Sequence, residues 1–149
     1  MAKIDETDMR ILGVLEQNSK LSSQKISRKT GIPITTVHNR VRKLEKEGII
    51  KGYTLVLDHE KLGRPLLAYI LVNYDMNAVG SKLTRDDLAK KLRQIGEAER
   101  ISYTTGRYDI VIVIRFRTIR DLDNLIMAKL RTIPGIGKTE TFIVMEEIK

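Results

Sequence analysis

Apolar residues recur three or four positions apart through the first 48 residues, and this period predicts three helices. The helices are expected at residues 5–17, 22–31 and 33–48. Asp5 opens the first as an N-cap with an acid three residues further on, and Gly31 ends the second as a left-handed stop. A tight turn therefore joins the second helix to the third.

The third helix carries one apolar stripe, Val37, Val41 and Leu44, spaced i, i+4 and i+7. Its other residues are polar or basic, as expected when one side lies in a core and the other lies against a polyanion. The alternative is a solvated polar face whose residues touch only water. Arg40 has a structural alternative of its own, a bond to an acid of its own or the neighbouring domain.

Residues 58–65 are polar, with glycine and proline, and they predict a linker. Ahead of them, Ile49–Leu57 is apolar and β-branched, which is typical of a strand or wing. The pattern therefore divides the chain into a helical domain at 1–57, the linker at 58–65 and a second domain at 66–149.

Short apolar strands alternate with capped helices after residue 65. Strands are expected at 66–74, 98–104, 110–114 and 138–145, helices at 83–95 and 118–133, and a loop at 76–82. The order β-α-β-β-α-β is the ferredoxin-like arrangement, in which two helices cover one face of a four-stranded sheet. The expected fold class is α+β.

Two of these strands are apolar at every position, Ala68–Val72 and Ile110–Ile114. A sheet covered on one face only should instead alternate apolar and polar residues. Because the chain has no further element to cover the second face, we expect the same face of a second copy to pack on it. The sequence therefore predicts a homodimer.

The positive charge is concentrated in the first domain. The chain has 27 Lys and Arg against 19 Asp and Glu, a net charge of +8. Residues 20–51 contain nine bases and two acids, so this segment alone carries +7. A local positive charge indicates nucleic acid, an anionic membrane surface or an acidic partner, and its location on the helices favours nucleic acid.

Other chemistry is poorly supported. Without cysteine there is no disulfide, thiolate nucleophile or cysteine metal ligand. No apolar run approaches the roughly 20 residues of a membrane span, and the N-terminus lacks the apolar core of a signal peptide, so a soluble cytoplasmic protein is expected. The two histidines, His38 and His59, are far apart, and no nucleophile and base stand out. We therefore expect neither an enzyme nor a metal or cofactor site.

Several short motifs occur along the chain in a fixed order and spacing, none decisive alone. They are Asp5…Asp8…Ile11-Leu12…Leu15, Val37…Arg40-Val41…Leu44-Glu45…Gly48-Ile49-Ile50…Gly52-Tyr53, Leu62-Gly63, Gly106-Arg107-Tyr108-Asp109 and Pro134-Gly135-Ile136 before Thr139 and Thr141. Together with the predicted two-domain order, these motifs resemble the Lrp/AsnC (feast/famine) family of transcriptional regulators.

The resemblance implies a winged helix-turn-helix followed by an effector-binding (RAM) domain. It also implies double-stranded promoter DNA as partner, homodimers that build tetramers or octamers, and an amino-acid effector. Two features depart from the family: Pro33 stands where a serine usually caps the recognition helix, and the loop 76–82 is longer than typical. The implied effector residues are Gly106, Tyr108, Asp109, Thr139 and Thr141.

Asparagine reads adenine and arginine reads guanine in the major groove, while lysine and threonine more often hold phosphate. The DNA-facing set predicted here is Ser23, Lys25, Thr35, Thr36, His38, Asn39, Arg40, Arg42, Lys43 and Lys46. Two alternatives stay open: an architectural DNA-binding protein of low specificity, and a tetrapyrrole decarboxylase of similar architecture. For residues 106–109 the alternative is a plain hairpin turn.

Overall fold

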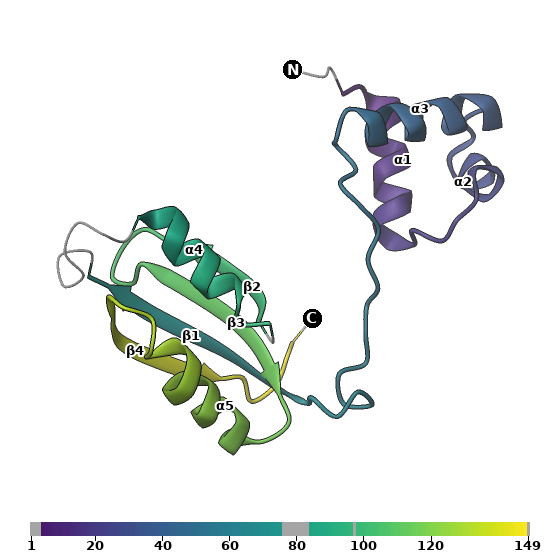
Figure 1. Ribbon diagram of the computed structural model, residues 1–149. Coiled ribbons are helices and arrows are strands. Elements are labelled where there is room, and N and C mark those ends of the chain that lie inside the picture. Colours follow the sequence, from purple (N-terminus) through teal and green to yellow (C-terminus); the bar gives the residue numbers. More distant parts are fainter. Residues whose placement is uncertain (1–3, 76–83, 97, 149) are drawn as a thin grey trace. The chain divides into compact units, whose positions relative to one another are not determined.

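The computed structural model describes residues 4–75, 84–96 and 98–148. The loop predicted at 76–82 and the helix start predicted at residue 83 lie outside the described residues. The chain divides into two compact units, Met1–Val56 and Leu57–Lys149 (Figure 1).

The first unit consists of three helices, α1 (Glu6–Gln17), α2 (Ser23–Thr30) and α3 (Ile34–Lys46). A capping box opens α1: the carboxylate of Asp5 accepts from the N–H of Asp8 at 2.9 Å, and the carboxylate of Asp8 accepts from the N–H of Asp5 at 3.2 Å. Gly31 ends α2 with a φ of 72°, which favours glycine. The helices enclose a small core of Ile11, Leu15, Ile26, Ile32 and Val37.

The strand or wing predicted at Ile49–Leu57 is not formed as a strand. The N–H groups of Ile49 and Ile50 both donate to the carbonyl of Leu44, at 2.9 and 3.1 Å, so the segment begins as the end of α3. Farther on, Val56 is 95% exposed. A strand needs a neighbour for its N–H and C=O groups, and among the described residues no strand pairs with this segment. Apolar, β-branched composition was therefore misleading here.

The second unit is the predicted β-α-β-β-α-β fold. Its elements are β1 (Leu66–Tyr74), α4 (Arg85–Arg93), β2 (Ala98–Tyr103), β3 (Ile110–Phe116), α5 (Ile119–Leu125) with its π-helical continuation η2 (Ile126–Leu130), and β4 (Ile136–Ile143). The strands form one antiparallel sheet in the order β2-β3-β1-β4, with both helices on the same face (Figure 1). The predicted α+β class is confirmed.

The register separates the two faces of this sheet. Ala68, Ile70 and Val72 pair with Ile114, Ile112 and Ile110, and all six are at most 1% exposed beneath α4 and α5. The residues between them point to the other side, because side chains alternate along a strand. We call this second side the open face, and its apolar residues that water reaches include Tyr69, Leu71, Val111, Val113 and Phe142.

Candidate nucleic-acid interface and effector region

The helix α3 has the two-sided character that its sequence predicts. Val37 is fully buried in the core that α3 shares with α1 and α2, Leu44 is also buried, and Val41 is half-buried. The polar side is directed to solvent, so its groups can reach a ligand without any rearrangement of the core. Exposed on it are Thr35, His38, Asn39, Arg42, Lys43 and Lys46, while Thr36 and Arg40 are half-buried.

Pro33 occupies the N-cap of α3 and provides no side-chain cap for its first turn. Its extended backbone, with φ −54° and ψ 139°, lets the helix begin directly at Ile34. The departure from the resemblance therefore leaves the helix start in place but removes the hydrogen bond that a serine would give. Besides its buried apolar stripe, α3 has a polar contact with the start of α1.

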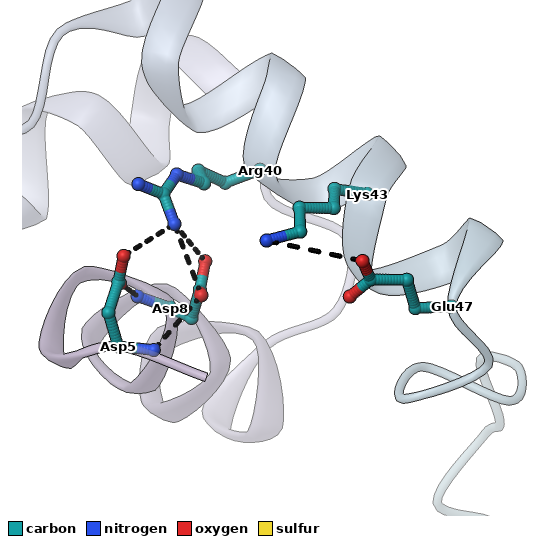
Figure 2. Close-up of polar contacts among 5 residues, drawn as sticks. All are labelled: Asp5, Asp8, Arg40, Lys43 and Glu47. Atoms are coloured by element: carbon teal, nitrogen blue, oxygen red, sulfur yellow. Dashed lines mark hydrogen bonds and ion pairs between the residues drawn. The ribbon is translucent and has the colours of Figure 1, made fainter. Parts of the chain in front are cut away.

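Arg40 makes that contact. Figure 2 shows its guanidinium reaching two carboxylates at the start of α1. Nη1 donates to Oδ2 of Asp5 at 2.6 Å and to both carboxylate oxygens of Asp8 at 3.2 Å. Asp8 is 1% exposed. We call these three residues the clamp; the same two acids also form the capping box of α1, so the clamp joins the start of α1 to the middle of α3.

The clamp assigns Arg40 the structural role that the sequence left open as an alternative. Its bond to Asp5, followed by the charges of Asp5 and Asp8, raises the pKa of the Arg40 guanidinium above its ordinary value. The pKa of Asp5 is lowered, first by the hydrogen bond from the Asp8 N–H and then, against the opposing effect of burial, by Arg40. A guanidinium shared between two acids is poorly available for a base.

The remaining DNA candidates differ in their surroundings. Lys43 pairs with Glu47 at 4.0 Å, a long contact between exposed groups that holds it weakly (Figure 2). On α2, Lys25 is exposed, whereas Ser23 is half-buried. Arg10 of α1 donates to the carbonyl of Thr30 at the end of α2, a contact that the sequence did not reveal.

The turn at residues 106–109 connects β2 to β3, and hydrogen bonds join it to the end of β1. Gly106 has a φ of 110°, a conformation that other residues rarely adopt. The carboxylate of Asp109 accepts from the N–H of Tyr74 at 2.8 Å, and the amide of Asn73 donates to the carbonyl of Arg107 at 2.9 Å. Asp109 thus serves the geometry of the turn, as the plain-hairpin alternative requires, and it also places a charge beside the end of β1.

Tyr108 contacts Glu140, a residue outside the predicted effector set. Its hydroxyl donates to the carboxylate of Glu140 on β4, and this bond is the main cause that raises the pKa of Tyr108. Thr139 and Thr141 pair with Val72 and Ile70 in the sheet register, which places them on the helix-covered face. The structure therefore brings Tyr108 and Asp109 together with Glu140 and Asn73, and separates both threonines from them.

The alternation of side chains along β4 is the sequence feature that could have indicated Glu140 in place of its neighbouring threonines. In a strand with side-chain period two, Thr139 and Thr141 must share a face that Glu140 does not share. Which of the two faces meets the 106–109 turn depends on the register with β1, and the sequence does not state that register.

Among the described residues, no cluster of three or more histidines and acids could hold a metal ion. Within the same ranges, no helix combines the length and the apolar character needed to cross a membrane.

Comparison with known proteins agrees with this two-part layout. Residues 4–51 match a model of winged helix-turn-helix DNA-binding domains, and residues 68–149 match the Lrp/AsnC ligand binding domain. The HTH-type transcriptional regulator FL11 of Pyrococcus horikoshii is 34% identical over 146 residues, which cover 98% of this chain and 92% of that protein.

Solved structures of transcriptional regulators also match this chain over nearly its whole length. AsnC of E. coli is 28% identical, with a TM-score of 0.78 over 97% of this chain and 94% of that one. The transcriptional regulator NMB0573 of Neisseria meningitidis, solved as an L-Met complex, is 26% identical, with a TM-score of 0.89 over 99% of this chain and 93% of that one. The chain belongs to the Lrp/AsnC family and is a transcriptional regulator with a DNA-binding domain and a ligand-binding domain.

Proposed function

We propose that this regulator recognises a specific DNA sequence through α3, that it acts as a dimer, and that a free amino acid modulates it. The observation that carries the first part is the exposed side of α3. Asn39 and Arg42 have the chemistry that reads base edges, and Lys43 and Lys46 beside them have the chemistry that holds phosphates. Because Arg40 is bound in the clamp, base reading falls to Asn39 and Arg42.

Footprinting of the full chain on promoter DNA separates this proposal from the architectural alternative. A dimer that reads sequence should protect discrete half-sites about one helical turn apart. Continuous protection without preferred positions would instead support a protein that wraps or bridges DNA.

The dimer is proposed from the open face. Tyr69 and Phe142 are 40% and 51% exposed there, beside the half-buried Leu71, Val111 and Val113. In a single chain these apolar side chains meet water across the middle of the sheet. Contiguous apolar surface of this kind marks an interface, and a two-fold axis lets the same patch cover itself.

We expect Leu71→Glu to halve the mass of the particle in light scattering at micromolar concentration. The new carboxylate would lie in the apolar centre of the interface, where burying an unpaired charge is costly. Met127→Glu is the matched control, because Met127 is 50% exposed on η2 and should keep the wild-type mass. A wild-type monomer, or a Leu71→Glu dimer, would contradict the proposed interface.

The amino-acid effector is proposed at the turn 106–109. L-Met is bound by the Neisseria meningitidis protein. In this chain, the carboxylate of Asp109 in the turn and that of Glu140 on β4 lie near the half-buried Asn73. A carboxylate suits the ammonium of an amino acid, and backbone N–H groups suit its carboxylate.

Calorimetric titration with the twenty amino acids tests the effector. We expect heat from at least one of them, and at least about tenfold weaker binding by Asp109→Asn, since a charge-assisted hydrogen bond is lost. Asparagine can still accept from the Tyr74 N–H, so this variant removes charge and preserves the turn. Asp58→Asn, which removes a remote carboxylate bound to Lys61, should bind as wild type. No heat from any amino acid would favour the plain hairpin.

A further inference from the structure

A cavity of about 370 Å³ lies on the helix-covered side of the second unit, at the end of β3 away from the 106–109 turn. Its floor is made by core residues, Ile114 and Phe116 of β3 and Leu122 and Leu125 of α5. The volume falls in the lower part of the range of about 300–1,000 Å³ that small-molecule sites occupy. The cavity is therefore large enough for a small metabolite and apolar enough to desolvate a hydrocarbon group.

The cavity lining contains the bases Arg64, Arg115, Arg117 and Lys129. Arg115 is paired with Glu99 at 3.2 Å and with Glu147 at 2.7 Å. Arg64 precedes β1 and Arg117 follows β3. Both are exposed, and within the described residues neither forms an ion pair. The only lining carboxylate, in the part of the chain that the structure describes, is Asp121, which is engaged at the N-cap of α5 by the N–H of Thr118 at 3.0 Å. The rim thus offers guanidinium groups to an anion.

Arg64 and Arg117 also lie on neighbouring stretches of chain. A Cβ built on Gly63 would stand 4.0 Å from Nε of Arg117, so the Arg117 side chain runs beside the backbone that carries Arg64. Guanidinium groups bind carboxylates through paired, planar hydrogen bonds, and two of them side by side favour a bound anion over water.

The wall opposite β3 contains the π-helical turn η2. Single π-turns within helices are rare and occur frequently at functional sites. The turn contributes the small residue Ala128 and the base Lys129 to the lining.

We propose that this cavity binds a small organic anion with an apolar body. The carboxylate of the ligand would lie between Arg64 and Arg117, and its hydrocarbon part against Phe116 and Leu122. The site is separate from the turn at Tyr108, because the two lie at opposite ends of β3. It depends neither on the DNA-reading face nor on the amino-acid effector.

Binding there has a consequence for the turn that precedes β1. Backbone N–H groups of Gly63 and Arg64 donate to the carbonyls of Glu60 and His59, both at 2.9 Å, which closes residues 59–64 into a compact turn. A ligand held by Arg64 and Arg117 together ties this turn to the end of β3. The amides of residues 63 and 64 should then exchange more slowly with solvent.

Titration of the full chain with hexanoate, read by calorimetry and by amide hydrogen exchange, tests the proposal. Hexanamide, with the same chain length and no charge, is the matched ligand. We expect hexanoate to bind at millimolar concentration or below, hexanamide to bind at least about tenfold more weakly, and exchange at residues 63 and 64 to slow.

Arg64→Gln and Arg117→Gln should each weaken hexanoate binding about tenfold or more, because each removes a charge-assisted contact. Both residues are exposed, so neither change disturbs the core. Arg131→Gln removes an exposed arginine outside the cavity and should bind as wild type. The proposal is overturned by absence of binding, by equal binding of hexanamide, by insensitivity to both substitutions, or by exchange protection centred on Tyr108. None of these results would alter the DNA-binding proposal, which footprinting tests separately.

Discussion

Arg40→Met is expected to lower the thermal midpoint of the helix-turn-helix unit by roughly 5–10 °C. The substitution leaves Asp8, 1% exposed, as a buried carboxylate without its counter-charge. It also removes the contact that joins the start of α1 to α3, whose own N-cap supplies no side-chain hydrogen bond. The measurement is thermal unfolding of the full chain, followed by the amide signals of α1, α2 and α3.

Two variants show whether the clamp causes this loss. Asp8→Asn combined with Arg40→Met should recover part of the stability, because the unpaired buried charge is gone. Lys43→Met changes a cation on the same helix whose ion pair with Glu47 is long, at 4.0 Å, and this variant should unfold close to wild type. Equal losses from Arg40→Met and Lys43→Met would mean that the clamp contributes nothing specific.

The same clamp should respond to acid. The folded-state pKa of Asp5 lies below its ordinary value of 3.8. The stability that Asp5 contributes is therefore fully present above that ordinary value, and it is lost as the pH falls through the lower, folded-state pKa. Between pH values of about 5 and 2, wild type should lose more stability than Asp5→Asn, which keeps the cap and cannot titrate.

Asn39→Ala and Arg42→Ala should reduce the discrimination between operator and random DNA by about tenfold or more each. Each removes a side chain whose geometry fits one base edge, and such a contact is worth about 1–3 kcal/mol of discrimination. Lys43→Ala should instead weaken binding to both DNAs alike, because phosphate contacts carry no sequence information. Competition binding at one fixed salt concentration measures all three ratios. Equal losses on both DNAs for Asn39→Ala and Arg42→Ala would identify these residues as backbone contacts.

Most helices and strands of this fold could be predicted from short sequence signals, namely helix caps and the spacing of apolar residues. Asp5, Thr84 and Thr118 each occupy an N-cap with an acid three residues further on, and each opens a helix in the structure. The apolar period of α3 and the strand composition of β1 and β3 were equally readable. In all these cases the signal lies within a few residues and agrees with the packing around it.

The features that the sequence did not predict are those in which a residue depends on a partner far away in the chain. The apolar segment Ile49–Leu57 had strand composition, but no strand pairs with it in the described part of the chain. For Arg40 the sequence left a structural role open beside a DNA contact, because the two acids that bind it are more than thirty residues away in the chain. Glu140 was not among the predicted effector residues, because its contact with Tyr108 depends on the register between β1 and β4.

Selection of bound DNA from a random pool, with the full wild-type chain, tests the central claim most directly. If a dimer reads DNA through α3, the pool should converge on a palindrome whose half-sites are separated by about one helical turn. The convergence should be lost with Asn39→Ala and Arg42→Ala combined, under salt conditions where the variant still binds DNA. A pool that binds without converging on any sequence would contradict the claim that the exposed side of α3 reads bases.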